Sequence, residues 1–343
     1  MKDKNHSQKP THSATAIAHP NIAFIKYWGN RDDTLRLPLN STLSMNLDGL
    51  ETRTTISFDE SLNADSLTLN GILQEGAGLA RVSAFLDSAR ELAVQRGILK
   101  PELQKRYFAQ VVSENSFPAG AGIASSASAF AALAMAVDGA LGLNLPEAQL
   151  SRLARLGSGS ASRSIPTGFV EWHAGQDDES SYAESFAPPS HWDLVDMVVI
   201  VDRGHKQVGS SQGHPLARTS PLNELRVAGV DERLKVCKNA ILARDFEAFA
   251  WATELDSEWM HAVMRTSTPS LRYWTELTEL ILWQVRYWRQ QGHALCTTVD
   301  AGPNVHVIGT QNELDFALPA LKALPGVMDV IVARPGAGAG LVS

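Results

Sequence analysis

Residues 113–127 read Ser-Glu-Asn-Ser-Phe-Pro-Ala-Gly-Ala-Gly-Ile-Ala-Ser-Ser-Ala, and this stretch carries the strongest local signal in the 343-residue chain. Pro118 stops any regular element before it, while Gly120 and Gly122 allow positive φ and close approach of the backbone. The small residues after them open an Ala-rich helix, whose first N–H groups lack partners within the helix and attract an anion. The stretch therefore predicts a phosphate-binding loop, although a close crossing of a helix and a strand would also require small residues.

Two common nucleotide-binding motifs do not describe this loop. It lacks the Gly-Lys-Ser/Thr of a Walker loop, and it does not follow the Gly-x-Gly-x-x-Gly spacing of dinucleotide-binding folds. The hydroxyl groups of Ser125 and Ser126 could still ligate Mg²⁺ or a phosphate oxygen at the start of the helix.

Three further segments could carry chemistry. Residues 157–164 read Gly-Ser-Gly-Ser-Ala-Ser-Arg-Ser, which suggests a second anion site with Arg163 as a two-point clamp, or else an ordinary loop with a surface arginine. Asp300 lies in the turn Asp-Ala-Gly-Pro-Asn, where an aspartate most often caps its own backbone. Lys26 follows a predicted strand beside Tyr27, where it is either desolvated and functional or stretched along the surface.

The composition limits the classes of function. Acidic residues outnumber basic ones by 37 to 30, which argues against a general nucleic-acid binder. Two cysteines exclude a disulfide framework, and no apolar run reaches the roughly 18 residues that cross a bilayer. Residues 1–13 are polar without an apolar segment, so we expect a disordered leader rather than a secretory signal, and a cytoplasmic protein.

The order of predicted elements indicates an α+β fold, because blocks of strands precede blocks of helices instead of alternating regularly with them. We expect an N-terminal domain over residues 14–185 and a C-terminal domain over residues 186–343. Residues 175–190 are acidic, contain prolines and lack periodicity, so we expect them to connect the two halves. The Gly-Ala-Gly-Ala-Gly sequence at residues 336–340 is expected to be a mobile tail.

Six segments together resemble the mevalonate (di)phosphate decarboxylases of the GHMP kinase superfamily. They occur in the order of that family and span residues 14 to about 310. The segments are His19–Gly29, Leu37–Ser44, Ser113–Ala127, Gly157–Ser164 with Gly168–Trp172, Ser210–Gly213 and Asp300–Asn304. One Gly-rich loop would be weak evidence, whereas six collinear motifs are strong evidence for the resemblance.

The resemblance implies a GHMP kinase-like fold, with two α/β sandwich domains, the ATP loop in the N-terminal one and the active site in the cleft between them. It also implies an ATP-dependent decarboxylation in isoprenoid synthesis, with ATP and Mg²⁺ as cofactors. In that reaction the C3 hydroxyl of a 5-phosphorylated mevalonate is phosphorylated. Phosphate and CO₂ then leave together to give an isopentenyl product. The family further suggests a homodimer.

The resemblance also assigns roles to individual residues. Asp300 would orient or deprotonate the C3 hydroxyl, Lys26 would stabilise the moving negative charge, and Arg163 would grip the substrate carboxylate. The predicted substrate-binding residues are Tyr27, Asn30, Arg81, Ser158, Ser160 and Ser210. The predicted ATP-binding residues are Ser113, Asn115, Pro118, Gly120, Gly122, Ser125 and Ser126. The metal ligands are left open.

One position departs from the family pattern. Relatives that use the diphosphate typically read Tyr-Trp-Gly-Lys, and that lysine contacts the terminal phosphates, whereas this chain has Asn30 there. One cation fewer suits one phosphate fewer, so we predict (R)-5-phosphomevalonate as substrate and isopentenyl phosphate as product. Arg31 or Lys206 could replace the missing cation. The alternatives are a diphosphomevalonate decarboxylase, a mevalonate 3-kinase and a non-catalytic GHMP-like binding protein.

The loop at residues 113–127 gives a first testable prediction. Replacing Gly122 with Val should raise the KM for ATP sharply, because a branched side chain would block the approach of the backbone to the phosphates. Steady-state kinetics with varied ATP measure the effect, with circular dichroism as the control for folding. A folded variant with wild-type ATP kinetics would show that the loop does not bind ATP.

Overall fold

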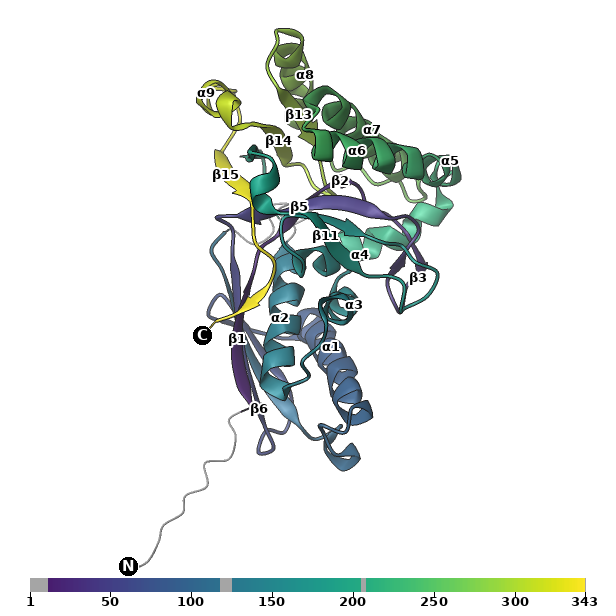
Figure 1. Cartoon of the computed structure of the whole chain (residues 1–343), viewed down its shortest axis with the longest axis vertical. Helices are drawn as coiled ribbons and strands as arrows, with labels where there is room; N and C mark the ends of the chain where they lie inside the picture. Colours follow the sequence, from purple (N-terminus) through teal and green to yellow (C-terminus); the bar gives the residue numbers. More distant parts are fainter. Residues whose placement is uncertain (1–11, 118–124, 205–207, 343) are drawn as a thin grey trace, which may run out of the picture.

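The computed structural model describes residues 12–117, 125–204 and 208–342 (Figure 1). The predicted leader therefore lies almost entirely outside the described residues, and the first strand begins at Ser13. The longer strands are β1 (Ser13–Ala18), β2 (Asn21–Ile25), β5 (Thr42–Asp48), β6 (Thr52–Asp59), β7 (Ser66–Leu69), β9 (Phe108–Asn115), β10 (Phe169–Trp172), β11 (Ala183–Ala187), β12 (Leu194–Ile200), β13 (Leu295–Thr298), β14 (Val305–Thr310) and β15 (Asp329–Pro335). The short strands are β3 (Asn30–Asp32), β4 (Leu37–Pro38), β8 (Ile72–Gln74) and β16 (Gly340–Leu341).

The helices form separate groups along the chain. They are α1 (Gly76–Gln95), α2 (Ser125–Leu141), α3 (Glu147–Gly157), α4 (Ser210–Gly213), α5 (Asn223–Ala228), α6 (Val230–Ala243), α7 (Phe246–Thr266), α8 (Glu276–Gln290) and α9 (Leu314–Lys322). A 3₁₀ segment, η2 (Gly159–Ser164), follows α3. Figure 1 shows α1, α2 and α3 in the lower half of the molecule and α5 to α8 in the upper half.

The lower half is built on a six-stranded sheet in the order β16-β1-β6-β9-β7-β8. β1, β6 and β9 are antiparallel neighbours, and β7 runs parallel to β9. The apolar residues of β6 alternate with polar ones, as expected for a strand with one face buried. Helix α2 packs on β1 and β6, and α1 and α3 join it over one apolar core.

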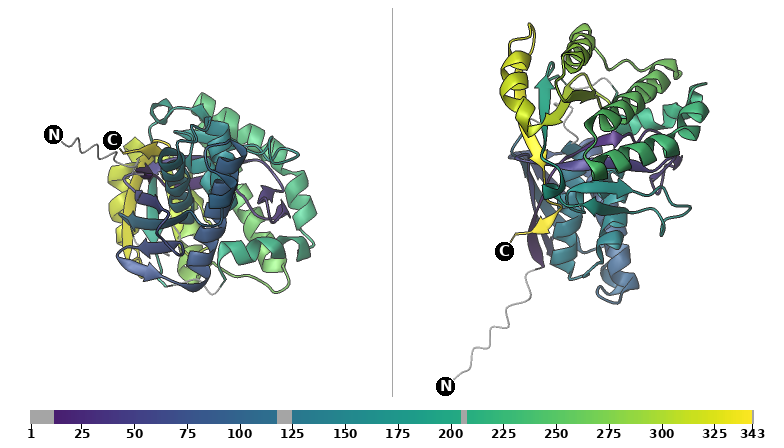
Figure 2. Two further views of the ribbon diagram at one scale, coloured as in Figure 1. Left: turned by 90° about the horizontal axis from the view of Figure 1, so that it is seen from below. Right: turned by 45° about the horizontal axis from the view of Figure 1, so that its top comes forward.

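The upper half is built on a second sheet, in the order β11-β10-β5-β15-β12-β14-β13, with β2 paired to β5. Helices α6 and α7 share one apolar core with it, and α8 and α9 contribute to another (Figure 2). β5 pairs with β15 through Arg334 opposite Asp48, so this sheet contains strands from both ends of the chain. The mixed α and β layers confirm the predicted fold class, while the division into two domains at residue 185 stays a prediction.

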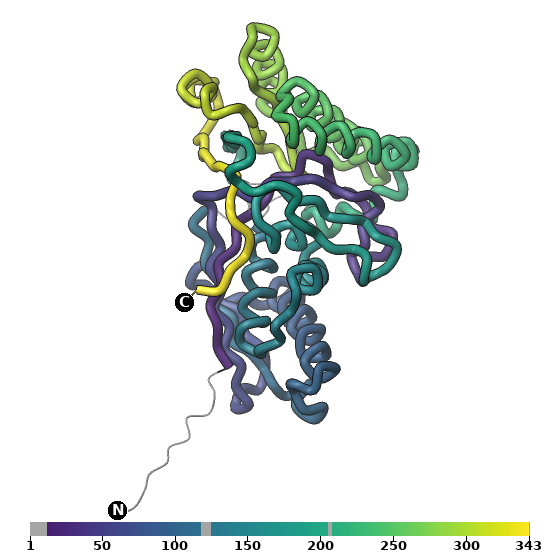
Figure 3. The backbone as a smooth tube through the Cα atoms, viewed as in Figure 1, coloured from purple at the N-terminus to yellow at the C-terminus, as the bar shows by residue number. Residues whose placement is uncertain are grey.

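Two expectations about irregular segments are wrong. The connection expected at residues 175–190 contains β11, which forms an antiparallel pair with β10. The tail expected at residues 336–340 is packed: β16 pairs with β1, and the C-terminal segment runs beside the N-terminal strand (Figure 3). A Cβ added to Gly338 would lie 2.2 Å from the carbonyl oxygen of Ile165. Glycine at this position therefore serves close backbone packing rather than mobility.

Candidate active site

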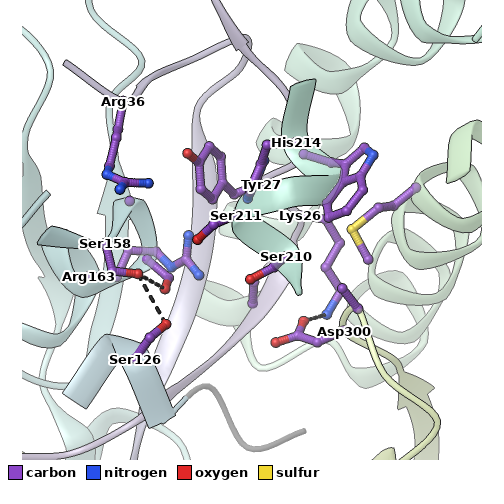
Figure 4. Close-up of a pocket in the computed structure, with 16 residues that line it drawn as sticks. Lys26, Tyr27, Arg36, Ser126, Ser158, Arg163, Ser210, Ser211, His214 and Asp300 are labelled. Carbon is purple, nitrogen blue, oxygen red and sulfur yellow. Dashed lines mark hydrogen bonds and ion pairs between the residues drawn. The ribbon is translucent and has the colours of Figure 1, made fainter. Parts of the chain in front are cut away.

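One pocket gathers eight of the thirteen predicted site residues that the structure describes (Figure 4). They come from the end of β2, the start of α2, η2, α4 and the turn after β13, five segments that are distant in sequence. The predicted residues that line the pocket are Lys26, Tyr27, Ser126, Ser158, Ser160, Arg163, Ser210 and Asp300.

A buried ion pair lies at one end of the pocket. The Nζ of Lys26 lies 2.6 Å from Oδ1 of Asp300; the lysine side chain is 1% exposed and the aspartate side chain 27%. Lys26 directly follows β2, and its backbone N–H donates to Oδ2 of Asp256 on α7 at 2.6 Å. The lysine is therefore fixed at both its backbone and its ammonium group, and the aspartate keeps a face open to the pocket.

Each member of this ion pair shifts the pKa of the other. Burial lowers the pKa of Lys26, although the neighbouring Asp300 carboxylate acts in the opposite direction. For Asp300, burial acts to raise the pKa, but the charges of Lys26, His306 and Arg163 outweigh it, and the pKa lies below the usual value. Asp300 is consequently ionised at neutral pH and available as a hydrogen-bond acceptor.

Helix α7 holds the backbone that presents Asp300. The hydroxyl of Ser257 accepts from the backbone N–H of Val299 at 3.1 Å, and Nε2 of His261 lies 3.1 Å from the Val299 carbonyl oxygen. His261 is fully enclosed, and burial lowers its pKa to about 3. The imidazole is therefore neutral and can donate its Nε2 proton to that carbonyl.

Arg163 is the second buried cation of the pocket. Its Nε donates to Oδ1 of Asn21 at 3.0 Å, and its Nη1 donates to the hydroxyl of Thr42 at 3.2 Å. Burial lowers its pKa to about 10, against the opposing charge of Asp300. Within the described part of the chain no carboxylate lies within ion-pair distance of this guanidinium. A bound anionic ligand would therefore neutralise its positive charge.

Hydroxyl groups line the wall beside Arg163. The Oγ atoms of Ser126 and Ser158 are 3.2 Å apart, and those of Ser158 and Ser160 are 3.3 Å apart. Gly159 lies between the last two, and a Cβ there would come within 2.5 Å of the Tyr27 ring. The glycine thus lets Tyr27 lie against the serine-rich segment. Burial raises the pKa of Tyr27 to about 12, so its hydroxyl stays protonated.

Sequence reasoning missed two residues of the pocket with strong structural roles. His214 accepts from the backbone N–H of Gly29 at 2.9 Å through Nδ1 and packs on the rings of Tyr27 and Trp28. Burial lowers its pKa to about 3, which makes it a neutral packing residue. It directly follows the Ser210–Gly213 motif, which could have pointed to it. Arg36 also lines the pocket and lies between two recognised motifs.

Several predicted residues lie outside this pocket. Arg81 contributes to a neighbouring cavity with apolar walls, and its guanidinium lies over Phe130. The other predicted residues in that cavity are Ser113, Asn115, Ser125 and Ser126, the last of which lines both spaces. Asn30 accepts from the Tyr27 hydroxyl and donates to Asp33 at 3.0 Å. Pro118, Gly120 and Gly122 lie outside the described residues.

The described residues form neither a metal-binding cluster nor a membrane-spanning helix. Among the described residues, no group of three His, Cys, Asp or Glu side chains is arranged to hold a metal ion. The described helices also include none with the length and apolar character needed to cross a membrane.

Comparison with known protein families covers almost the whole chain. Residues 18–183 match the diphosphomevalonate decarboxylase-like N-terminal domain, and residues 196–331 match the mevalonate 5-diphosphate decarboxylase C-terminal domain. The diphosphomevalonate decarboxylase of Candida albicans is 39% identical over 319 residues, covering 90% of this chain and 88% of the relative. The human enzyme of that name is 38% identical over 313 residues, covering 87% and 77%.

Solved structures give the same result. The mevalonate diphosphate decarboxylase from Staphylococcus aureus superposes with a TM-score of 0.87 at 35% identity, covering 96% of this chain and 98% of that one. The one from Enterococcus faecalis gives 0.86 at 36% identity, with 96% and 99% covered. A structure described as MDDEF in complex with MVAPP, AMPPCP and magnesium gives 0.87 at 37% identity, with the same coverage.

The family matches and the shared fold identify an ATP-dependent carboxy-lyase with the GHMP kinase fold. Within that class, the chain belongs to the mevalonate diphosphate decarboxylase family. Its reaction is accordingly the ATP-dependent decarboxylation of a mevalonate derivative.

The buried imidazole behind Asp300 gives a prediction about pH. His261 has a pKa of about 3 in the folded protein and about 6.5 when unfolded, so the unfolded state binds the extra proton between these values. Its contribution to stability is complete above pH 6.5 and falls as the pH drops towards 3. Replacing His261 with Gln keeps a donor for the Val299 carbonyl and removes the titration.

We expect the free energy of unfolding of the His261→Gln variant to depend less on pH between 4 and 6, by up to about 1.4 kcal/mol per pH unit. Denaturant titrations of both proteins across that range measure the difference. An equal pH dependence in the two proteins would mean that the imidazole is not buried in its neutral form.

Proposed function

We propose that this decarboxylase acts on a mevalonate that carries its phosphate group or groups at C5, and that Asp300, Lys26 and Arg163 act directly on it. The observation that carries the proposal is the placement of an ionised, partly open carboxylate and an unpaired buried guanidinium in one pocket. A ligand that places a hydroxyl group beside Asp300 and a carboxylate beside Arg163 has the groups of a β-hydroxy acid.

The proposed chemistry follows from these positions. Asp300 accepts the proton of the C3 hydroxyl, and the ammonium group of Lys26 stabilises the negative charge that develops on that oxygen. Arg163 holds the C1 carboxylate by a two-point contact. ATP with Mg²⁺ supplies the phosphoryl group that converts the C3 oxygen into a leaving group. The C3–O bond electrons then leave with phosphate, the C1–C2 bond electrons form the C2=C3 double bond, and CO₂ departs.

The neighbouring cavity fits the nucleotide in this proposal. Its apolar walls suit a nucleotide base. Its polar rim contains four of the residues predicted to bind ATP, which are Ser113, Asn115, Ser125 and Ser126. The first residues of α2 lie at the border between this cavity and the substrate pocket, so the helix N-terminus is placed to favour phosphate groups. Mg²⁺ commonly binds through phosphate oxygens with few protein ligands, which agrees with the absence of a three-residue metal cluster among the described residues.

Two substrates are compatible with this site. The diphosphate is the better supported one, because the relatives named above are diphosphomevalonate decarboxylases. The monophosphate is supported by one specific observation: Asn30 replaces the lysine typical of that family, and its amide donates to the carboxylate of Asp33. Position 30 therefore presents a neutral amide held by Asp33, where a lysine would offer a cation to a second phosphate.

The role of Asp300 is tested by the Asp300→Asn variant. We expect kcat to fall by at least about 10²-fold, because the amide cannot accept the hydroxyl proton. Nucleotide affinity should stay unchanged, since Asp300 does not line the nucleotide cavity. Thermal unfolding controls for the loss of the partner of Lys26. A folded variant with near wild-type kcat would show that the carboxylate only forms the turn.

The substrate is tested by measuring kcat/KM for 5-phosphomevalonate and 5-diphosphomevalonate side by side, with CO₂ release as the readout. If position 30 determines the choice, Asn30→Lys should move the ratio towards the diphosphate by roughly 10- to 150-fold, the equivalent of about 1.5–3 kcal/mol. The double variant Asn30→Lys/Asp33→Asn controls for capture of the new lysine by Asp33. An unchanged ratio in both variants would remove position 30 from substrate selection.

A further inference from the structure

We propose that Arg36, together with Arg81, binds the phosphoryl group at the C5 end of the substrate. This inference rests on the proposed function and adds a residue that no recognised motif contains. Its chemistry is the recognition of phosphate oxygens by two guanidinium groups, and it applies to a monophosphate or a diphosphate.

The position of Arg36 fits a substrate with three anchored groups. Arg36 lines the same pocket as the Lys26–Asp300 pair. Figure 4 shows Arg36 and this pair at opposite sides of the pocket, with Arg163 and Ser158 towards the Arg36 side. A chain that places its hydroxyl at Asp300 and its carboxylate at Arg163 would direct its far end towards Arg36.

Both guanidinium groups are held in the same way by the end of one helix. Nε of Arg36 donates to the carbonyl oxygen of Leu156 at 3.0 Å, and Nε of Arg81 donates to that of Gly157 at 2.9 Å. These are the last two residues of α3, where the helix dipole favours cations. The shared anchor uses one nitrogen of each arginine and leaves the terminal nitrogens available for a ligand.

The two arginines carry charge that their surroundings do not neutralise. Burial lowers the pKa of Arg81 to about 10, and the charge of Arg36 acts in the same direction. In the ranges that the structure describes, no carboxylate lies within 4 Å of either guanidinium. Two like charges held together without a counter-charge are stabilised by an anion that bridges them.

The backbone of Arg36 has a left-handed conformation that is unusual for arginine, which suggests that its side chain has a function. Its φ of 51° is in the left-handed region, which is unfavourable for a residue with a Cβ atom relative to a right-handed conformation. Gly or Asn would adopt this conformation more easily. An arginine that keeps such a backbone is typical of strain retained at a functional site.

Arg36 is also better placed than Arg31 to supply the positive charge that the chain lacks at position 30. Arg31 is exposed and donates to the carbonyl oxygen of Ala174 at 2.8 Å. Arg218 pairs with Asp33 at the surface. Lys206 lies outside the described residues. Of the three arginines Arg31, Arg36 and Arg218, Arg36 is the one that lines the substrate pocket.

The test uses Arg36→Asn, which removes the guanidinium and suits the left-handed backbone. Arg31→Asn is the matched control, since it makes the same change of charge five residues away. Calorimetry with 5-phosphomevalonate and with 5-diphosphomevalonate should show affinity weakened roughly 10- to 150-fold in Arg36→Asn for at least one of them. The control should bind both as the wild type does, and the KM for ATP should not change in either variant.

The pattern of losses identifies the phosphate. A loss for both substrates means that Arg36 holds the inner phosphate, and a loss for the diphosphate alone means that it holds the terminal one. Asn30→Lys introduced into Arg36→Asn should restore part of the lost affinity. A purely structural role predicts a lower Tm, whereas we expect the Tm of Arg36→Asn to equal or exceed that of the wild type.

The inference and the proposed function fail in different ways. Wild-type affinity of Arg36→Asn for both substrates would overturn the role of Arg36, whatever the activity. A wild-type protein that releases no CO₂ from either substrate would overturn the proposed function, while the calorimetric comparison would still decide whether Arg36 binds phosphate.

Discussion

The active site depends on a network of buried charges that fixes the backbone of Lys26. Asp256 accepts the backbone N–H of Lys26 and also pairs with Nε of Arg233 at 2.8 Å. Arg226 donates to the carbonyl oxygen of Lys26 at 2.8 Å. Each of these charges is costly to bury alone, and removing one partner would leave another uncompensated. The network joins the end of β2 to α5, α6 and α7, so Lys26 is positioned by helices that follow it by some 200 residues.

The pocket is electropositive in a protein whose net charge is −7. Among the residues that the structure describes, three cations, Lys26, Arg36 and Arg163, line it together with one carboxylate, Asp300. Such a local excess attracts anions even when the whole molecule is acidic. Burial strengthens each interaction in the pocket and lowers the pKa of both Lys26 and Arg163, because a charge is costly to bury. A substrate with two anionic ends would offset part of that cost.

The sequence was sufficient for the parts of the site that lie inside contiguous motifs. The turn at Asp300, the serine-rich segment at Arg163 and the strand end at Lys26 were predicted, and the structure places them around one pocket. Arg36 was not predicted, because its anchor is a helix end some 120 residues away and its backbone conformation has no sequence signal for an arginine. β11 and β16 were missed because acidic and Gly-rich segments have low strand propensity, and only their partners stabilise them as strands.

The position of β15 has a consequence for the synthesis of the chain. Its residues 329–335 lie between β5 and β12, so without it the second sheet would separate into one group of strands from residues 21–187 and another from residues 194–310. β16, a few residues later, covers the edge of β1. A ribosome-bound chain would therefore expose unpaired strand edges until these last segments had emerged. The two groups of strands therefore cannot join into one sheet before β15 is available to pair with both of them.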